Sequence, residues 1–437
     1  MESSNESEIN LKKSKLQGCI QAIPSKSHVH RLLIAAALYG QETIIHFGAN
    51  PSADIIATID CLKALNANIA FENGSIYIKK ESISKAGSKV DLYCNESGST
   101  LRFMLPVVCA LGLNSAFHPK GRLPQRPLSP LREELIAHGA QIDETGTLPF
   151  CTKGVLSGGK YEIAGNISSQ YITGLLFALP LLNEPSEIII TGKLESKPYI
   201  DMTLEVLSYF GTDIHVENEN HILIGGANNN KKSAEKLEFY ADGDWSNAAF
   251  WLAAGAIGNE MTVSGLRLNS AQGDKAIYKL LEEFGAKVNC TKKENDLYDV
   301  SVQPGKLSAI EIDASDIPDL VPILSLVAAC ANGTTKIYNA QRLRIKESDR
   351  LATVHELLST LGAKITETQD GLIIEGNPSA SPLSGGRVSS HNDHRIAMTA
   401  AIASTVSKGE INITGAEAVN KSYPNFWNDF KHLSKEV

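Results

Sequence analysis

The sequence lacks the features of several protein classes. None of its apolar runs approaches the ~18 residues of a membrane-spanning helix, and its start, MESSNESEINLKK, has no apolar signal core. Basic residues do not dominate either: 41 Lys and Arg stand against 49 Asp and Glu, a net charge of −8. We therefore expect a cytoplasmic protein that binds neither membranes nor nucleic acid, and any anion that it binds must be held locally.

Signals for metal and nucleotide binding are also missing. The seven cysteines are scattered with no C-x-x-C pair, so we expect reduced thiols that mostly fill the interior. His28 and His30 have no further ligand nearby, which argues against a metal site. No G-x-G-x-x-G follows a strand, and Gly154–Lys160 has phosphate-loop spacing but is followed by Tyr161 where a Ser or Thr should hold magnesium. We interpret that segment as a turn.

An internal repeat is the strongest feature that is present. Five times a helical apolar stripe ends at a capping residue and an alternating strand pattern follows; the caps are Asn66, Gly139, Gly211, Gly285 and Gly362. Their spacing of 72 to 77 residues suits a small unit of two helices and several strands, and about six units would fill the 437 residues. The alternative is that such junctions are common in any α/β protein, but the even spacing favours a repeat.

Six units divide naturally into two lobes of three. A polar segment at 225–236 and a break around Pro24 mark candidate boundaries. We therefore predict one lobe at 25–242 and a discontinuous lobe made of 1–24 plus 243–437, to which the N-terminal strand returns.

Three helix starts in the 25–242 lobe present hydroxyls and free amides, which are the elements of an anion site. They lie in Ser25–Arg31, Asn95–Arg102 and Gly165–Tyr171. Each could be an ordinary helix cap. Three such starts in one half of an acidic chain suggest that they converge on a polyanionic small molecule.

Charged clusters recur elsewhere along the chain. Two prolines stiffen the loop around Arg126, and the C-terminal half carries Asp316–Asp319, Arg342–Arg350, His391–Arg395 and Lys421–Pro424. On a helix, Lys346 and Arg350 would be an i,i+4 basic pair, which costs stability unless an anion lies between them. The alternative is a solvated, salt-bridged helix face.

Taken in order, the segments resemble those of the 5-enolpyruvylshikimate-3-phosphate (EPSP) synthase family over essentially the whole chain. The shared motifs are P-S-K-S-x-x-x-R, G-S-T-x-R, R-P-L-x-P-L, S-S-Q, S-K-P-Y-I-D, I-P-D, K-E-S-D-R, N-D-H-R and K-S-Y-P. The resemblance implies an α/β (α+β) fold of two lobes, each of three βαβαββ units, joined by a two-strand hinge. It implies a shikimate-pathway transferase, on the route to chorismate and the aromatic amino acids, that acts as a monomer.

The implied reaction transfers the enolpyruvyl group of phosphoenolpyruvate to the 5-hydroxyl of shikimate 3-phosphate and releases phosphate, with no metal or organic cofactor. The resemblance assigns shikimate 3-phosphate to Lys26, Ser27, Arg31, Ser168, Ser169, Gln170, Ser196, Tyr199, Asp319 and Lys346. It assigns phosphoenolpyruvate to Lys26, Gly98, Arg126, Gln170, Arg350, Arg395 and Lys421. The lobe of 243–437 would thus carry the cations and carboxylates on the phosphoenolpyruvate side.

The chemistry needs a base for the 5-hydroxyl and an acid for the methylene carbon of phosphoenolpyruvate. The catalytic candidates are Asp319 for the hydroxyl and Glu347 for the methylene, with Lys26 as an alternative proton donor. The sequence leaves open which group moves which proton. Two lobes joined by a hinge would close on the acceptor, so we expect shikimate 3-phosphate to compact the molecule.

The chain departs from the family pattern at a few positions. Arg342 stands where family members carry a substrate-binding asparagine, so its role stays open, while Phe103 replaces a proline and Ser99 a threonine. One alternative function is the sister transfer to UDP-N-acetylglucosamine, but residues 112–126 lack the cysteine typical of that enzyme's mobile loop. A second is a non-catalytic anion-binding protein, which would not need the candidate carboxylates.

Overall fold

The computed structural model describes residues 7–435 except 41, 80–82, 85, 145 and 231–235, so part of the polar segment predicted at 225–236 lies outside the described residues. The chain forms two compact units: unit 1 is Met1–Ser25 with Asp242–Val437, and unit 2 is Lys26–Ala241. The two connections between the units lie side by side. Pro24 forms an antiparallel bridge with Gly243, and the Ser25 amide donates to the Asp242 carbonyl at 2.7 Å.

Unit 2 contains three repeats with one order of elements. The first is β7 (Lys89–Asn95), α3 (Gly98–Ala110), β8 (Asn114–Pro119), α4 (Leu131–Ala137), β9 (Gln141–Ile142) and β10 (Phe150–Lys153). The second is β11 (Gly159–Ala164), α5 (Ser169–Ala178), β12 (Ser186–Thr191), α6 (Lys197–Tyr209), β13 (Ile214–Asn218) and β14 (His221–Ile224). The third is β15 (Leu237–Tyr240), α1 (Lys26–Leu38), β4 (Thr43–His46), α2 (Ala53–Ala64), β5 (Asn68–Glu72) and β6 (Ser75–Lys79), so its first strand comes from the far end of the unit.

Unit 1 repeats the pattern with one exception. Its first repeat is β3 (Gly18–Gln21), α7 (Trp245–Ile257), β16 (Met261–Leu266), α8 (Ile277–Phe284), β17 (Lys287–Lys292) and β18 (Tyr298–Gln303). Its second is β19 (Glu311–Asp313), α9 (Val321–Cys330), β20 (Gly333–Tyr338), α10 (Arg350–Thr360), β21 (Lys364–Glu367) and β22 (Leu372–Gly376). The last comprises β23 (Gly386–Ser389), α11 (His394–Ala403), β24 (Ile411–Thr414), α12 (Phe426–Leu433) and the N-terminal β1 (Glu8–Leu11), while β2 (Lys15–Leu16) pairs with β25 (Ser434–Lys435).

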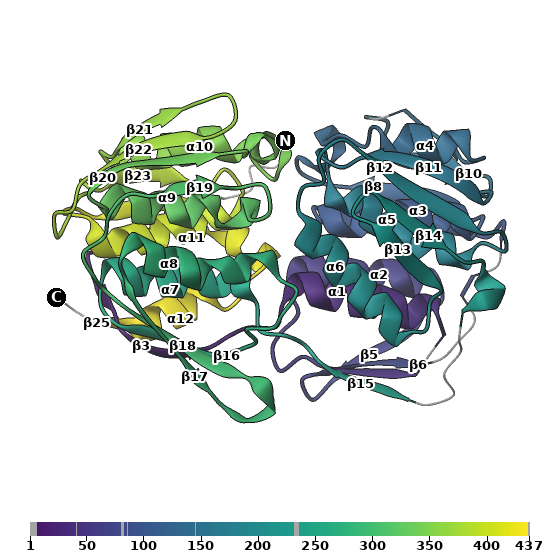
Figure 1. The fold of residues 1–437 in the computed structure, drawn as a ribbon, viewed down its shortest axis with the longest axis horizontal. Coiled ribbons are helices and arrows are strands. Elements are labelled where there is room, and N and C mark those ends of the chain that lie inside the picture. Colours follow the sequence, from purple (N-terminus) through teal and green to yellow (C-terminus); the bar gives the residue numbers. More distant parts are fainter. Residues whose placement is uncertain are drawn as a thin grey trace. The chain divides into compact units, whose positions relative to one another are not determined.

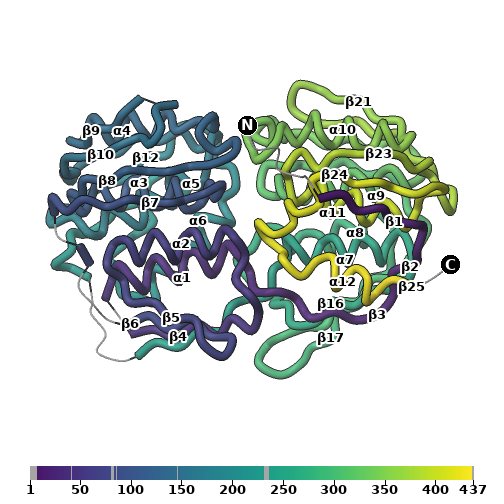
Figure 2. Tube along the Cα trace, turned by 180° about the vertical axis from the view of Figure 1, so that it is seen from behind, coloured from purple at the N-terminus to yellow at the C-terminus, as the bar shows by residue number. Residues whose placement is uncertain are grey.

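Five of the sheets have four strands in the same arrangement. In each, the first two strands of the repeat are parallel and the other two pair antiparallel, as in the order β7-β8-β10-β9. The last sheet has three strands, because β1 pairs antiparallel with β24 in place of a closing hairpin. Figure 2 shows this N-terminal segment running beside the C-terminal strands of unit 1. The predicted fold class is confirmed, and the last repeat is the departure from strict βαβαββ order.

The predicted repeat junctions are real helix ends. All five capping residues have positive φ: 72° at Asn66, 106° at Gly139, 71° at Gly211, 110° at Gly285 and 86° at Gly362. Glycine reaches this left-handed region without a Cβ clash, and asparagine tolerates it. The strands that follow are β5, β9, β13, β17 and β21, the same strand in each repeat.

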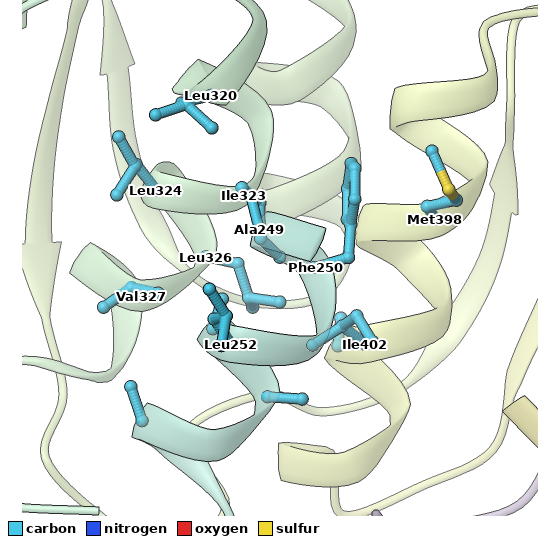
Figure 3. Packing of buried hydrophobic residues seen from close by; sticks show 14 of the residues in the cluster. Ala249, Phe250, Leu252, Leu320, Ile323, Leu324, Leu326, Val327, Met398 and Ile402 are labelled. Atoms are coloured by element: carbon cyan, nitrogen blue, oxygen red, sulfur yellow. The ribbon is translucent and has the colours of Figure 1, made fainter. Parts of the chain in front are cut away.

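The helices lie among the sheets within each unit (Figure 1). Ten of ten residues are buried in α9 and in α11, and α7 is nearly as deeply covered. Figure 3 shows Phe250, Leu252, Ile323, Met398 and Ile402 packed together in the unit 1 core. Such helices are apolar on nearly every face, and the charged residue of α11, Arg395, lies in its first turn. Among the described residues, no helix combines the length and apolarity needed to cross a membrane.

Candidate active site

The start of α1 carries a paired lysine. The Nζ of Lys26 lies 2.7 Å from Oδ2 of Asp54, which is in the first turn of α2, and the two side chains are only 17% and 14% exposed. A carboxylate in a first turn is favoured by the helix dipole, so Asp54 is a well-placed counter-ion for Lys26. Sequence analysis missed Asp54 because an acidic residue at a helix start is also an ordinary pattern.

One turn further along α1, Arg31 joins two helices. It is buried, and it donates to Oγ1 of Thr203 at 2.8 Å and to the main-chain carbonyls of Ser27 at 2.7 Å and Tyr199 at 2.9 Å. Its guanidinium also lies 5.4 Å from the ring centre of Phe103. Burial lowers the pKa of Arg31 to about 10, which still leaves it charged at neutral pH. Arg31 therefore ties α1 to α6 and holds the predicted residues Ser27 and Tyr199 in one cluster.

The loop before α3 brings a glycine against two arginines. A Cβ at Gly98 would lie 2.6 Å from Nη1 of Arg126 and 2.8 Å from Nη1 of Arg102. The cap residue Ser97 accepts a hydrogen bond from the Thr100 amide. Two guanidinium groups thus stand directly over a helix N-terminus, where backbone amides and the helix dipole also favour an anion. The predicted pair of Gly98 and Arg126 is brought together, as expected of one anion site.

Arg102 links this loop to the start of α5. It is 2% exposed and donates to Oε1 of Gln170 at 3.1 Å and to the Pro127 carbonyl at 3.0 Å, while Nε2 of Gln170 donates to Ser99 at 3.0 Å. These bonds fix the orientation of Gln170. Arg102 was part of a motif in the sequence analysis but was not named as a site residue. The signal that could have identified it is a charged residue between the apolar Leu101 and Phe103.

The serines of unit 2 occupy helix starts. Ser168 is the N-cap of α5, and its Oγ accepts a hydrogen bond from the Gln170 amide at 3.3 Å. At this helix start, the alternative of an ordinary helix cap is therefore correct. Ser169 opens the same helix and is buried. Ser196 precedes α6 in the left-handed conformation, with φ of 56°. A non-glycine residue in that region is strained, and such strain is typical of sites where a side chain or amide must point in a set direction.

In unit 1, Asp319 lies among three cations. It follows Pro318 in a short 3₁₀ helix, η6 (Pro318–Leu320), and accepts from Arg350 Nη1 at 2.7 Å and Arg395 Nη2 at 3.0 Å, with the Lys346 Nζ at 3.9 Å. Burial alone raises the pKa of Asp319, but the charges of Arg395, Lys346 and Arg350 outweigh it and hold the pKa below its usual range. Asp319 is therefore ionised, and its cations keep it a weak base.

Arg350 is the centre of the unit 1 cluster. It opens α10, its side chain is 1% exposed, and it donates to Glu347 Oε2 at 2.7 Å and Asp393 Oδ2 at 2.7 Å as well as to Asp319. Burial lowers the pKa of Arg350, but the three carboxylates outweigh it and raise the pKa above its ordinary value. Asp393, fully buried at the cap of α11, also accepts from Ser348 at 3.0 Å. Sequence analysis quoted Asp393 in its motif without assigning it a role.

The prediction that Lys346 and Glu347 could lie on the same helix as Arg350 is wrong. The helix α10 begins at Arg350 with Asp349 as its cap, so both residues lie before it. Asp349 can bond the amide of Ala352, which favours a helix start at that point over an extension toward the N-terminus. The anion between Lys346 and Arg350 nevertheless exists, since Asp319 contacts both.

Three further cations of unit 1 lie in or next to short 3₁₀ helices: Lys421 ends η9 (Ala416–Lys421), Arg342 lies in η7 (Gln341–Ile345) and Lys346 follows η7. Lys421 donates to the Asn392 carbonyl at 2.6 Å, beside a turn in which His391 and Asn392 both have positive φ. Arg342, whose role the sequence left open, is buried and donates to the Ser315 carbonyl. Burial lowers the pKa of Lys346 to about 8, against the raising effect of Asp319.

Comparisons with known proteins identify the family. The family model for EPSP synthase (3-phosphoshikimate 1-carboxyvinyltransferase) matches residues 11–430. A 3-phosphoshikimate 1-carboxyvinyltransferase of Clostridium perfringens is 44% identical over 421 residues, covering 96% of each chain. One of Clostridium kluyveri is 40% identical over 430 residues, covering 98% of each chain. The structure of EPSP synthase from Acinetobacter baumannii matches with a TM-score of 0.79 at 25% identity, covering 98% of both chains.

These matches extend over both units and include the segments that hold every candidate residue. The chain therefore belongs to the EPSP synthase family, and the predictions of an enzyme of this class and of enolpyruvyl transfer to shikimate 3-phosphate are confirmed.

Proposed function

We propose that most of the groups that bind shikimate 3-phosphate belong to unit 2 and that two belong to unit 1. The residues are Lys26, Ser27, Arg31, Ser168, Ser169, Gln170, Ser196, Tyr199, Asp319 and Lys346. Hydroxyls and amides at the starts of α1, α5 and α6 are suitable donors for a phosphate and for ring hydroxyls. Arg31 retains its charge while buried, and its bonds to Ser27 and Tyr199 support a pre-organised site.

Phosphoenolpyruvate is bound by Lys26, Gly98, Arg126, Gln170, Arg350, Arg395 and Lys421. The observation that carries this proposal is the carboxylate of Asp319 between Arg350 and Arg395. Guanidinium groups bind substrate carboxylates and phosphates in the same way as they bind aspartate, so the substrate competes with Asp319 for these donors. When the substrate neutralises the two arginines, the pKa of Asp319 rises toward the range of an effective base.

The reaction proceeds by addition and elimination. Asp319 takes the proton of the 5-hydroxyl, whose oxygen attacks the enol carbon of phosphoenolpyruvate, while the methylene carbon receives a proton and becomes a methyl group. Glu347 gives that proton from its protonated form, after the substrate has taken its place as a partner of Arg350, and Lys26 is the alternative donor. In the elimination, the group that gave the methylene proton takes one methyl proton back and phosphate leaves, which restores the double bond. Fixed cations stabilise the charge that develops on the carboxylate and the phosphate. The expectation of a cytoplasmic, cofactor-independent monomer rests on the sequence alone.

The test is release of inorganic phosphate from phosphoenolpyruvate with a metal chelator present, comparing wild type with Lys26→Ala. We expect release that requires shikimate 3-phosphate and falls by about 100-fold or more in the variant. Lys160→Ala is the matched control, because Lys160 is an exposed lysine of unit 2 that pairs with Glu162 on β11. Release with UDP-N-acetylglucosamine in place of shikimate 3-phosphate, or undiminished release in Lys26→Ala, would contradict the assignment.

A further inference from the structure

A buried carboxyl group of unit 1 has no role in the proposed chemistry. Asp274 lies in a short 3₁₀ helix, η4 (Gly273–Ala276), and is 1% exposed. Its Oδ2 accepts a hydrogen bond from Ser246. Its Oδ1 is also buried and, within the described part of the chain, has no hydrogen-bond partner. An ionised carboxylate in this setting is costly, whereas a protonated one is tolerated.

Asp274 is linked to the proposed phosphoenolpyruvate site through α7. Ser246 is in the first turn of α7, and α7 packs against η4, against η6 with Asp319, and against α11 with Arg395. On η4 itself, Lys275 donates to a main-chain carbonyl at 2.7 Å. The helix α8 also packs on η4, and the residues it buries are Ile277, Leu281 and Phe284. The charged groups that act on Asp274 therefore come mainly from α7, η6 and α11.

These charges place the titration of Asp274 near neutrality. Burial, together with the negative charges of Asp319 and Asp244, raises the pKa of Asp274 to about 7, against the lowering effects of Arg395 and the Ser246 hydrogen bond. Asp244, the cap of α7, is itself buried and accepts from the Asn247 amide at 2.8 Å. Asp319 and Asp274 are thus both stabilised in the ionised form by the positive charge of Arg395. Of the two, only Asp274 has a buried oxygen without a hydrogen-bond partner in the described part of the chain.

We propose that Asp274 is a positioning residue that takes up a proton when an anion binds at Arg395, so that protonation and anion binding favour each other. The inference rests on the proposed function, which places an anionic group of phosphoenolpyruvate on Arg395. An anion there removes the positive charge that keeps Asp274 ionised. By linkage, binding is strongest when Asp274 is already protonated, below about pH 7, and weakens as the pH rises above that value.

The experiment measures kcat/KM for phosphoenolpyruvate at saturating shikimate 3-phosphate from about pH 6 to about pH 9 in wild type, Asp274→Asn and Ser246→Ala. We expect the wild-type value to fall about fivefold or more above about pH 7. The uncharged Asp274→Asn mimics the protonated acid, so it should match wild type at the acid end and lack this fall. Ser246→Ala removes a hydrogen bond that favours the ionised form, so the fall should move to higher pH.

A second readout is independent of turnover. Calorimetric titration with sulfate, in buffers of different ionisation enthalpy, should detect uptake of a fraction of a proton per anion near neutral pH in wild type and less in Asp274→Asn. Thermal unfolding checks that both variants fold. If Asp274→Asn does not fold, the pH profile and proton uptake of Ser246→Ala provide the test. An unchanged pH profile and unchanged uptake in the variants would overturn this inference. Absence of any phosphoenolpyruvate turnover in wild type would instead overturn the proposed function.

Discussion

The cations of unit 2 and those of unit 1 are held by different kinds of partner. Arg31 donates to a hydroxyl and two main-chain carbonyls, and Arg102 donates to an amide oxygen and a carbonyl. Arg350 and Arg395 instead donate to carboxylates, and both donate to Asp319. Neutral partners orient an arginine and leave its charge in place, whereas carboxylates neutralise it. There are exceptions to this contrast in both units: Lys26 of unit 2 pairs with a carboxylate, and Lys421 and Arg342 of unit 1 donate to main-chain carbonyls.

This difference matches two tasks of the proposed reaction. A site that only holds a phosphate needs fixed positive charge and gains little from groups that titrate near neutrality. A site that moves protons needs acids and bases whose pKa values change as substrate binds. In unit 1, Asp319, Lys346 and Asp274 all have shifted pKa values, with lowering at the first two and raising at the third. The contrast predicts that changes in unit 1 affect turnover and its pH dependence, and that changes in unit 2 affect affinity.

The largest effect is expected for Asp319→Asn. The amide cannot accept the 5-hydroxyl proton, so kcat should fall by about 10³-fold. The neutral side chain also leaves Arg350 and Arg395 less compensated, so the KM for phosphoenolpyruvate should not rise. Steady-state kinetics with varied phosphoenolpyruvate measure both kcat and this KM. Asp316→Asn, a change at an exposed residue just before η6, is the control. Near-normal turnover in Asp319→Asn would remove Asp319 from the mechanism.

In unit 2, Arg31→Lys should reduce affinity more than turnover. Lysine keeps the charge but cannot bond Thr203, Ser27 and Tyr199 together, so one or two charge-assisted hydrogen bonds are lost. We expect shikimate 3-phosphate to bind about 10- to 100-fold more weakly. Arg132→Lys is a matched control, since Arg132 also donates to two main-chain carbonyls but lies at α4. A large loss of kcat with unchanged affinity would break the contrast between the units.

Gly98→Ala tests the crowded loop under the arginines. The added Cβ would meet Arg126 Nη1 at 2.6 Å and Arg102 Nη1 at 2.8 Å, so the guanidinium groups must move. We expect the KM for phosphoenolpyruvate to rise about tenfold, with binding of shikimate 3-phosphate little changed. Ser99→Ala is the neighbouring control, because it removes only a hydroxyl that accepts from Gln170. An equal loss of affinity for both substrates would indicate general disruption of α3.

The repeat was predictable from sequence because its signal is local. A capping residue at a helix end needs positive φ, which restricts its identity, and the five caps therefore recur visibly as Asn66 and four glycines. The first strands of two repeats carry no such signal. Strands β3 and β15 pair with β16 and β4 across more than 190 residues, and the three-stranded last sheet depends on the distant β1.

The site was predictable where motifs mark it and not where packing creates it. Gly98, Arg126 and Gln170 come together as the motifs suggest, whereas Asp54 and Arg102 act through contacts with residues far away in sequence. Asp274 is the clearest case. An acidic residue after a glycine looks like an ordinary loop residue. Its pKa is shifted because tertiary packing buries it and brings the charges of Asp319, Arg395 and Asp244 near it.

The smallest expected effect is a difference between the units in the pH at which a substrate-binding cation loses its charge. Burial lowers the pKa of Lys346 in unit 1 to about 8 and that of Arg31 in unit 2 to about 10. Only charged Lys346 attracts an anion, so kcat/KM for shikimate 3-phosphate, measured at saturating phosphoenolpyruvate in an Asp274→Asn background, should fall a few-fold above about pH 8. Adding Lys346→Arg, whose guanidinium stays charged, should remove that fall while changing the value at pH 7 little. If the fall persists in Lys346→Arg and is centred near pH 10, the titrating group is Arg31 instead. The pH-sensitive cation would then belong to unit 2, which contradicts the contrast between the units.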